Sequence, residues 1–438
     1  MVNWYLHNGS VYRNQRIKQE SVLILGGLIV AFGEAADEAR QLFRGPIRDF
    51  DAGGQLISAG FIDLHTHLRE PGFENKETIV SGTMAAVAGG FTTVCPMPNT
   101  NPTLDSLEVF DDLAKRIRNN AHCKVQPIAA LTQGRQGTKT VDYKGFKARG
   151  VVLFSDDGDP LDENVAEEAF VGVGEVGGVL INHLEDKALI GKGFFYEQIP
   201  PESEYLMLKR DLELVRKTRC RYHVAHVSAW QTVELITKAR AEGLPVTAEV
   251  TPHHLTLTYE DIKEPRGHFQ MKPPLRTEKD RRALVEALNS GVIDIVATDH
   301  APHGTEKEQG LFDGSPFGVT ALETTFPALY TELVLKGTLS LERLLYSLTI
   351  APGAILGVEA ELKVGARADV AVLDLIQEKV ITKELFQSKG TNSPFIGRTL
   401  QGWPSLTLVD GCPAYEYGCP AYEYGCPAYE NAGEVYTC

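Results

Sequence analysis

The sequence predicts an α/β fold: a (β/α)8 TIM-type barrel with a small β domain formed from both termini. Three observations support this prediction. The chain has 438 residues, which suits a barrel with an appended domain better than one ordinary small domain. Eight short, mostly apolar runs recur through the middle of the chain, as expected for parallel strands covered on both faces. Helix-like segments separate many of these runs.

Residues 1–55 are expected to form the N-terminal part of the small β domain. Short strand-like runs such as Ser21–Ile24 occur there together with turns at Asn8-Gly9 and Gly53-Gly54. Residues 56–357 are expected to form the barrel, because they contain the eight runs. These runs are Leu56–Asp63, Phe91–Met97, Lys124–Leu131, Gly150–Phe154, Gly178–Asn182, Arg221–His226, Pro245–Val250 and Asp294–Thr298.

The spacing of apolar residues predicts helices between the barrel strands at Ser106–Asn119, Tyr205–Lys217, Ala229–Glu242 and Glu278–Asn289. Residues 358–438 become β-like again, so we expect them to complete the small β domain. Their last part repeats Cys-Pro-Ala-Tyr-Glu, first at Cys412–Glu416 and then in two further copies. Because each copy contains a proline, a continuous helix is excluded, and we interpret the repeat as an expansion of a terminal strand or loop.

The composition limits the classes of partner. A net charge of −15 argues against nucleic acid or an anionic membrane as the main partner, although a local Arg and His cluster can still bind a small anionic substrate. The sequence contains no apolar run of about 18 residues, and its start lacks the features of a signal peptide. We therefore expect a cytoplasmic protein. The absence of a Cys-x-x-Cys pair gives no support to a thiolate zinc site.

The motif Asp63-Leu64-His65-Thr66-His67-Leu68-Arg69-Glu70 closes the first apolar run. Side chains alternate across a strand, so His65 and His67 should point the same way and form half of a metal site. An isolated pair of histidines would fit a core or surface role equally well. Further His and Asp residues at later strand ends favour the metal site, namely Asp156, Asp157, His183, His226, Asp299 and His300.

Imidazole and carboxylate together are the ligand set of zinc-like ions. Even four histidines and two aspartates from this set exceed what one tetrahedral catalytic zinc requires, and two metal ions that share a bridging carboxylate would account for the surplus. From the residues alone, either Asp156 or Asp157 could bridge.

Several long motifs occur in an order that identifies a family. They are Asp63–Gly72 (DLHTHLREPG), Gly89–Thr100 (GGFTTVCPMPNT), Phe154–Gly158 (FSDDG), His223–Ser228 (HVAHVS), Thr247–His254 (TAEVTPHH), Pro273–Arg276 (PPLR) and Ala297–His303 (ATDHAPH). Across nearly its whole length the chain resembles the dihydroorotases of the amidohydrolase superfamily. The resemblance implies the reversible cyclisation of N-carbamoyl-L-aspartate to L-dihydroorotate and water in pyrimidine (UMP) biosynthesis.

The resemblance also implies a ligand set for two Zn²⁺ ions per chain: His65, His67, Asp157, His183, His226 and Asp299. Many relatives bridge the ions with a carboxylated lysine on the fourth strand, but residues 150–154 contain no lysine. This favours the subgroup that bridges with the second Asp of FSDDG, which is Asp157. Asp299 is also expected to move the proton between the attacking water and the leaving nitrogen.

The substrate carries a carboxylate, and the family residues that bind it correspond to Arg69, Asn99 and His303. Phe317 and Gly318 are expected to contact the ring, and residues 304–314 to form a loop that closes over the site. Lys272 stands where relatives commonly carry an Asn that contacts the substrate. Lysine is longer and cationic, so it could pair with the substrate or clash with it. We expect Lys272→Asn to be equally or more active.

Two other functions compete with this interpretation. One is another cyclic-amide hydrolase, such as an allantoinase, hydantoinase or dihydropyrimidinase, which Arg69, Asn99 and His303 disfavour. The other is an inactive homologue that acts as a scaffold, which the complete ligand set disfavours. Some relatives associate with aspartate transcarbamoylase, so the resemblance leaves room for that partner and for a homo-oligomer.

Overall fold

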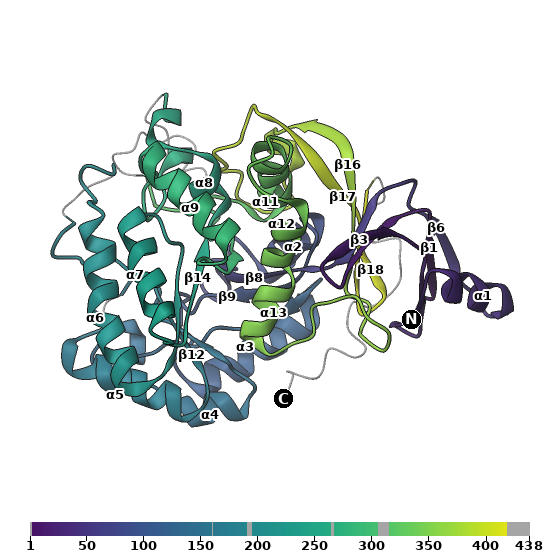
Figure 1. Cartoon of the computed structure of the whole chain (residues 1–438). Coiled ribbons are helices and arrows are strands. Elements are labelled where there is room, and N and C mark those ends of the chain that lie inside the picture. The colour runs from purple at the N-terminus through teal and green to yellow at the C-terminus, as the bar shows by residue number, and fades with distance from the viewer. Residues whose placement is uncertain (1, 160, 191–194, 264–266, 305–314, 418–438) are drawn as a thin grey trace.

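The structure is a computed structural model that describes residues 2–159, 161–190, 195–263, 267–304 and 315–417 (Figure 1). A barrel of strands enclosed by helices forms the larger part, and a β-rich part lies beside it. Among the helices of the described ranges, none combines the length and the apolarity needed to cross a bilayer.

The predicted barrel is confirmed. Parallel pairing joins β8 to β9 and β9 to β10, and a second parallel run extends from β11 to β15. Parallel bridges between Ala129 and Phe154 and between Thr66 and His300 connect the two runs and close the ring. The strands are β8 (Phe61–Thr66), β9 (Phe91–Pro96), β10 (Lys124–Val125), β11 (Leu153–Phe154), β12 (Val179–Asn182), β13 (Arg221–Val224), β14 (Val246–Val250) and β15 (Ile295–Val296).

Helices follow most barrel strands and bury one face. In α3 (Leu107–Asn120) the hydroxyl of Ser106 caps the first turn by accepting from Val109 N, while Phe110 and Leu113 are buried in the core. The other helices described around the barrel are α2 (Ile79–Ala88), α4 (Tyr143–Ala148), α5 (Glu163–Glu175), α6 (Glu202–Thr218), α7 (Trp230–Ala241), α8 (Pro252–Thr256), α9 (Glu278–Ser290), α11 (Thr325–Leu329), α12 (Leu341–Leu348) and α13 (Ile350–Leu356).

The β-rich part is built from both ends of the chain, as predicted. A six-stranded sheet has the order β18 (Cys412–Glu416), β17 (Thr399–Val409), β16 (Val370–Val380), β7 (Leu56–Ala59), β2 (Ser10–Arg13) and β3 (Arg16–Gln19). A four-stranded sheet has the order β5 (Leu28–Phe32), β4 (Val22–Leu25), β1 (Trp4–His7) and β6 (Arg48–Asp51), and α1 (Glu34–Leu42) packs against it. β18 is the first copy of the tail repeat, and the other two copies lie outside the described residues.

The first apolar run, Leu56–Asp63, was wrongly predicted as one barrel strand. Its first half is β7, which pairs with β16 and β2 in the six-stranded sheet, and the barrel strand β8 begins only at Phe61. The break is at Gly60, where a Cβ atom would lie 2.1 Å from Thr92 Cγ2. Because only glycine fits so close to β9, the chain can pass there from one sheet to the other. The small β domain therefore extends to Ala59 rather than to residue 55.

Candidate metal centre

β8 and β11 bring three potential ligands together. His65 is fully buried near the end of β8, and His67 follows directly after that strand. Their rings lie on the same side, with centroids 5.5 Å apart, as the alternation of strand side chains predicts. Asp157 follows β11. The ligand atoms of these three residues all lie within 4.8 Å of one another, which is the spacing of groups that can share a metal ion.

The remaining predicted ligands surround this group. Asp299 Oδ1 lies 3.1 Å from His67 Nε2 and 3.5 Å from His65 Nε2. The ring centroid of His226 lies 5.1 Å from that of His65 and 4.4 Å from that of His183. The structure thus gathers all six predicted ligands at the carboxyl ends of the barrel strands, where functional residues of such barrels occur.

The state of the imidazoles fits a metal. His65 Nδ1 lies 2.6 Å from Glu249 Oε1, whereas its Nε2 is buried and has no hydrogen-bond partner among the described residues. A carboxylate that fixes one ring nitrogen and leaves the other open is the usual arrangement around a metal-bound histidine. Burial, helped by the neighbouring His183 and His65, lowers the pKa of His226 to about 3. His226 is therefore neutral, which is the form that binds metals.

The two aspartates of FSDDG have different environments. Asp156 accepts hydrogen bonds from Leu131 N at 2.7 Å and from Thr132 N at 3.1 Å, so its carboxylate holds the loop after β10. Asp157 instead lies 3.6 Å from His65 Nε2. These contacts place Asp157, rather than Asp156, among the potential ligands of this centre.

Several predicted site residues share an unusual backbone conformation. Arg69, Asp157, His226 and Asp299 have φ angles of 61°, 40°, 28° and 47°. This left-handed region costs a residue other than glycine about 1–3 kcal/mol and persists where surrounding contacts hold it, often at functional sites. Here the four residues follow closely after barrel strands, and their left-handed backbone sets the direction in which their side chains point.

The predicted substrate-binding residues lie next to the centre. The guanidinium of Arg69 lies 3.4 Å from both the Pro302 carbonyl oxygen and His303 Nε2. The same His303 nitrogen is 2.7 Å from the Phe317 carbonyl oxygen. Asn99 contacts the ligands themselves, with its Oδ1 3.0 Å from His67 Nδ1 and its Nδ2 donating to Asp157. The predicted closing loop lies outside the described residues except for Gly304.

Lys272 is already paired in this structure. Its Nζ lies 2.9 Å from Glu185 Oε1 and 4.7 Å from the centroid of the Phe317 ring. Glu185 Oε2 is in turn 3.9 Å from His183 Nε2. Although burial opposes ionisation, His183 and Lys272 lower the pKa of Glu185 to about 2. Glu185 is therefore ionised, and its carboxylate compensates the positive charge of Lys272.

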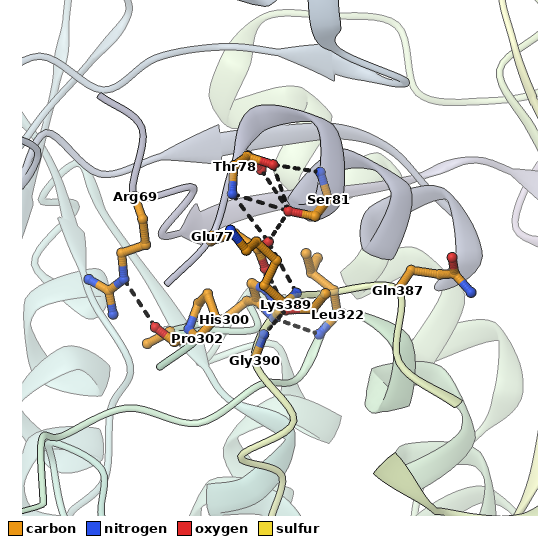
Figure 2. A network of polar contacts seen from close by, with 12 residues as sticks. Arg69, Glu77, Thr78, Ser81, His300, Pro302, Leu322, Gln387, Lys389 and Gly390 are labelled. Atoms are coloured by element: carbon orange, nitrogen blue, oxygen red, sulfur yellow. Dashed lines mark hydrogen bonds and ion pairs between the residues drawn. The ribbon is translucent and has the colours of Figure 1, made fainter. Parts of the chain in front are cut away.

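Sequence reasoning missed several supporting acids. Glu249, inside β14, contacts both His65 and His223. Glu77 lies 3.4 Å from His300 Nε2, so His300 faces this acid, and Figure 2 shows how the surrounding network reaches residues 387–390. An acidic residue within a buried apolar strand was the available signal for Glu249, because acids are rarely fully buried without a partner.

Comparisons with known proteins show which proteins this chain resembles. A family model described as dihydro-orotase-like matches residues 54–232, and the amidohydrolase family model matches residues 162–413. A dihydroorotase of Bacillus cytotoxicus is 42% identical over 414 residues, which is 92% of this chain and 97% of that protein. A dihydroorotase of Geobacillus sp. is also 42% identical, over 93% and 97% of the two chains.

Solved structures of related enzymes have the same fold. The L-hydantoinase (dihydropyrimidinase) of Arthrobacter aurescens superposes with a TM-score of 0.86 at 28% identity, covering 95% of this chain and 96% of that one. The dihydropyrimidinase of Brevibacillus agri superposes with a TM-score of 0.84 at 22% identity over 95% of each chain, which supports the fold alone.

Proposed function

The chain belongs to the dihydroorotase family of the amidohydrolases, and from that premise we propose that it interconverts N-carbamoyl-L-aspartate and L-dihydroorotate at a centre of two zinc ions. One observation supports this proposal most strongly. Arg69, two residues after His67, is partly buried and lies within 3.4 Å of His303 at the edge of the metal centre. A planar cation beside a metal centre suits a cyclic amide that carries a carboxylate.

Six side chains would hold the metal. Histidine nitrogen and aspartate oxygen together suit Zn²⁺, and six such groups suit two ions better than one. His65, His67, Asp157 and Asp299 surround one region of the centre, and His183 and His226 extend it. Divalent ions bound there would polarise the amide carbonyl and make water a nucleophile near neutral pH.

Asp299 is the proposed proton carrier. Its oxygen lies between His65 and His67, and these two imidazoles lower its pKa below the usual range despite its burial. Asp299 is therefore an unprotonated acceptor at neutral pH, and it can take a proton from the attacking water and return it to the ring nitrogen that leaves.

Arg69 and His303 are the proposed carboxylate clamp. The two side chains meet where the first and last barrel strands are adjacent, Arg69 after β8 and His303 after β15. Asn99 would orient His67 and Asp157, and we propose that its amide also meets the substrate. Phe317 and Gly318 would contact the ring through their backbone, and Lys272 would face the substrate while it is paired with Glu185.

A comparison of substrates tests the proposal. We expect the purified protein to hydrolyse L-dihydroorotate with a higher kcat/KM than dihydrouracil, hydantoin or allantoin, and to lose that preference in Arg69→Ala. Arg282→Ala, which removes an exposed arginine that pairs with Glu278, is the matched control. Higher kcat/KM for any of the other three substrates would contradict the proposal and favour a hydantoinase-like enzyme. A cytoplasmic location, a homo-oligomer and association with aspartate transcarbamoylase stay predictions.

A further inference from the structure

The segment of residues 387–393 belongs to the C-terminal part of the chain, between β16 and β17, but it packs against the predicted substrate-binding residues beside the metal centre. Two buried acids anchor its start. The backbone N–H groups of Gln387 and Ser388 donate to Glu323 Oε1, and the Ser388 hydroxyl and Lys389 N donate to Glu77. Figure 2 shows this segment approaching Pro302 and His300.

Asn392, near the end of this segment, makes three hydrogen bonds to the predicted substrate-binding segments. Its side chain is fully buried. Its Oδ1 accepts from His303 N at 3.1 Å, and its Nδ2 donates to the carbonyl oxygens of Gly318 at 3.0 Å and Ala301 at 3.3 Å. A carboxamide is the side chain that offers one acceptor and two donors in this arrangement.

These bonds fix the backbone on both sides of the carboxylate clamp. His303 N is held by Asn392, and His303 Nε2 is 2.7 Å from the carbonyl oxygen of Phe317, the residue before Gly318. The direction of the His303 ring thus depends on its own backbone and on the Phe317–Gly318 backbone, and the side-chain amide of Asn392 binds both.

The chain also packs tightly beside this contact. A Cβ atom on Gly390 would lie 2.6 Å from Pro302 Cβ, so the segment leaves no room for a shift of Pro302. The Pro302 carbonyl oxygen in turn accepts from Arg69 Nε at 3.4 Å. The 387–393 segment therefore supports both members of the clamp, His303 through Asn392 and Arg69 through Pro302.

We propose that Asn392 is a positioning residue for substrate binding, which sets His303 and the Phe317–Gly318 backbone against the substrate carboxylate and ring. This inference rests on the proposed function, because it takes His303 as a member of the carboxylate clamp. Asn392 acts through other residues and leaves the metal ligands alone. Its loss should therefore weaken substrate binding without removing metal.

Steady-state kinetics of L-dihydroorotate hydrolysis and metal content per chain, measured on the same samples, test this. We expect Asn392→Ala to raise KM about tenfold while kcat changes less than about threefold, because ground-state contacts with the substrate are lost. Metal content should equal that of the wild type. Asn392→Asp keeps the acceptor for His303 N and should give an intermediate KM. Asn289→Ala is the matched control, since it removes an exposed amide that donates to the Thr338 carbonyl oxygen, and should leave KM unchanged.

A KM within about twofold of the wild type in Asn392→Ala, or a loss of metal and kcat at constant KM, would overturn the inference. If Asn392→Ala does not fold, Asn392→Asp is judged by the same criteria. His303→Ala separates the two proposals. If His303→Ala raises KM and the folded Asn392 variants do not, only the role of Asn392 fails. If His303→Ala leaves KM unchanged, the clamp itself fails.

Discussion

Replacing Lys272 by Asn removes the cation that compensates Glu185 beside the metal centre. The two charged groups, 2.9 Å apart, attract by about 6 kcal/mol at an effective dielectric constant of about 20. The Lys272 side chain is 27% exposed and that of Glu185 is 6% exposed, so screening and desolvation cancel most of this attraction. We expect a net coupling between the two residues of about 1.5 kcal/mol.

The single variant should therefore bind substrate more weakly. Without Lys272, the Glu185 carboxylate adds an uncompensated negative charge near an anionic substrate. A repulsion of about 1 kcal/mol corresponds to about a fivefold rise in KM for dihydroorotate. The sequence alone predicted equal or higher activity for Lys272→Asn, and the ion pair reverses this expectation.

A double-mutant cycle measures the coupling. KM for dihydroorotate and the free energy of unfolding in urea are compared for wild type, Lys272→Asn, Glu185→Gln and the double variant. We expect the double variant to recover a KM close to that of the wild type. The reasoning is refuted if the double variant is as impaired as Lys272→Asn, because Lys272 would then contact the substrate directly and not merely balance Glu185.

Three further predictions concern the acids of the site. Asp157→Asn should lose bound metal, whereas Asp156→Asn should retain it and lower the urea midpoint; metal analysis of both variants checks this, and equal retention would contradict it. Glu249→Gln should weaken zinc affinity by about 10–100-fold through the freed His65 ring, as measured by chelator competition, and unchanged affinity would contradict it. Burial raises the pKa of Glu323 from 4.5 when unfolded to about 8 when folded, with nearby Glu77 adding to the shift. The protonation of Glu323 contributes fully to the free energy of unfolding below pH about 4.5, and this contribution is lost as pH rises to about 8. The free energy of unfolding of the wild type should therefore fall relative to that of Glu323→Gln across that window. Parallel pH profiles of the two proteins would contradict this assignment.

The sequence was sufficient to predict which side chains gather at the candidate centre, because their positions follow a simple geometric rule. Strand alternation places His65 and His67 on one side, and the carboxyl ends of parallel strands meet at one end of a barrel. Asp157, His226 and Asp299 could thus be expected near them without any coordinates. The left-handed backbone at these three residues could not be expected, because even Asp and His, which enter this region more often than most residues, adopt it only rarely.

The sequence could not predict contacts that depend on the path of the chain between domains. The run Leu56–Asp63 is apolar throughout, so its division at Gly60 depends on the distance to Thr92, which is a tertiary feature. Asn392 contacts His303 from 89 positions further along the chain, and no local pattern marks it. The pairing of Lys272 with Glu185 likewise joins residues 87 positions apart.

Zinc titration of the metal-free protein tests the central claim most directly. Protein stripped by a chelator is titrated with Zn²⁺ while bound metal and the rate of L-dihydroorotate hydrolysis are followed together. We predict no activity without metal and a rate that saturates at about two ions per chain. Full activity in the metal-free protein, or no activity at any zinc occupancy, would contradict the assignment of this centre.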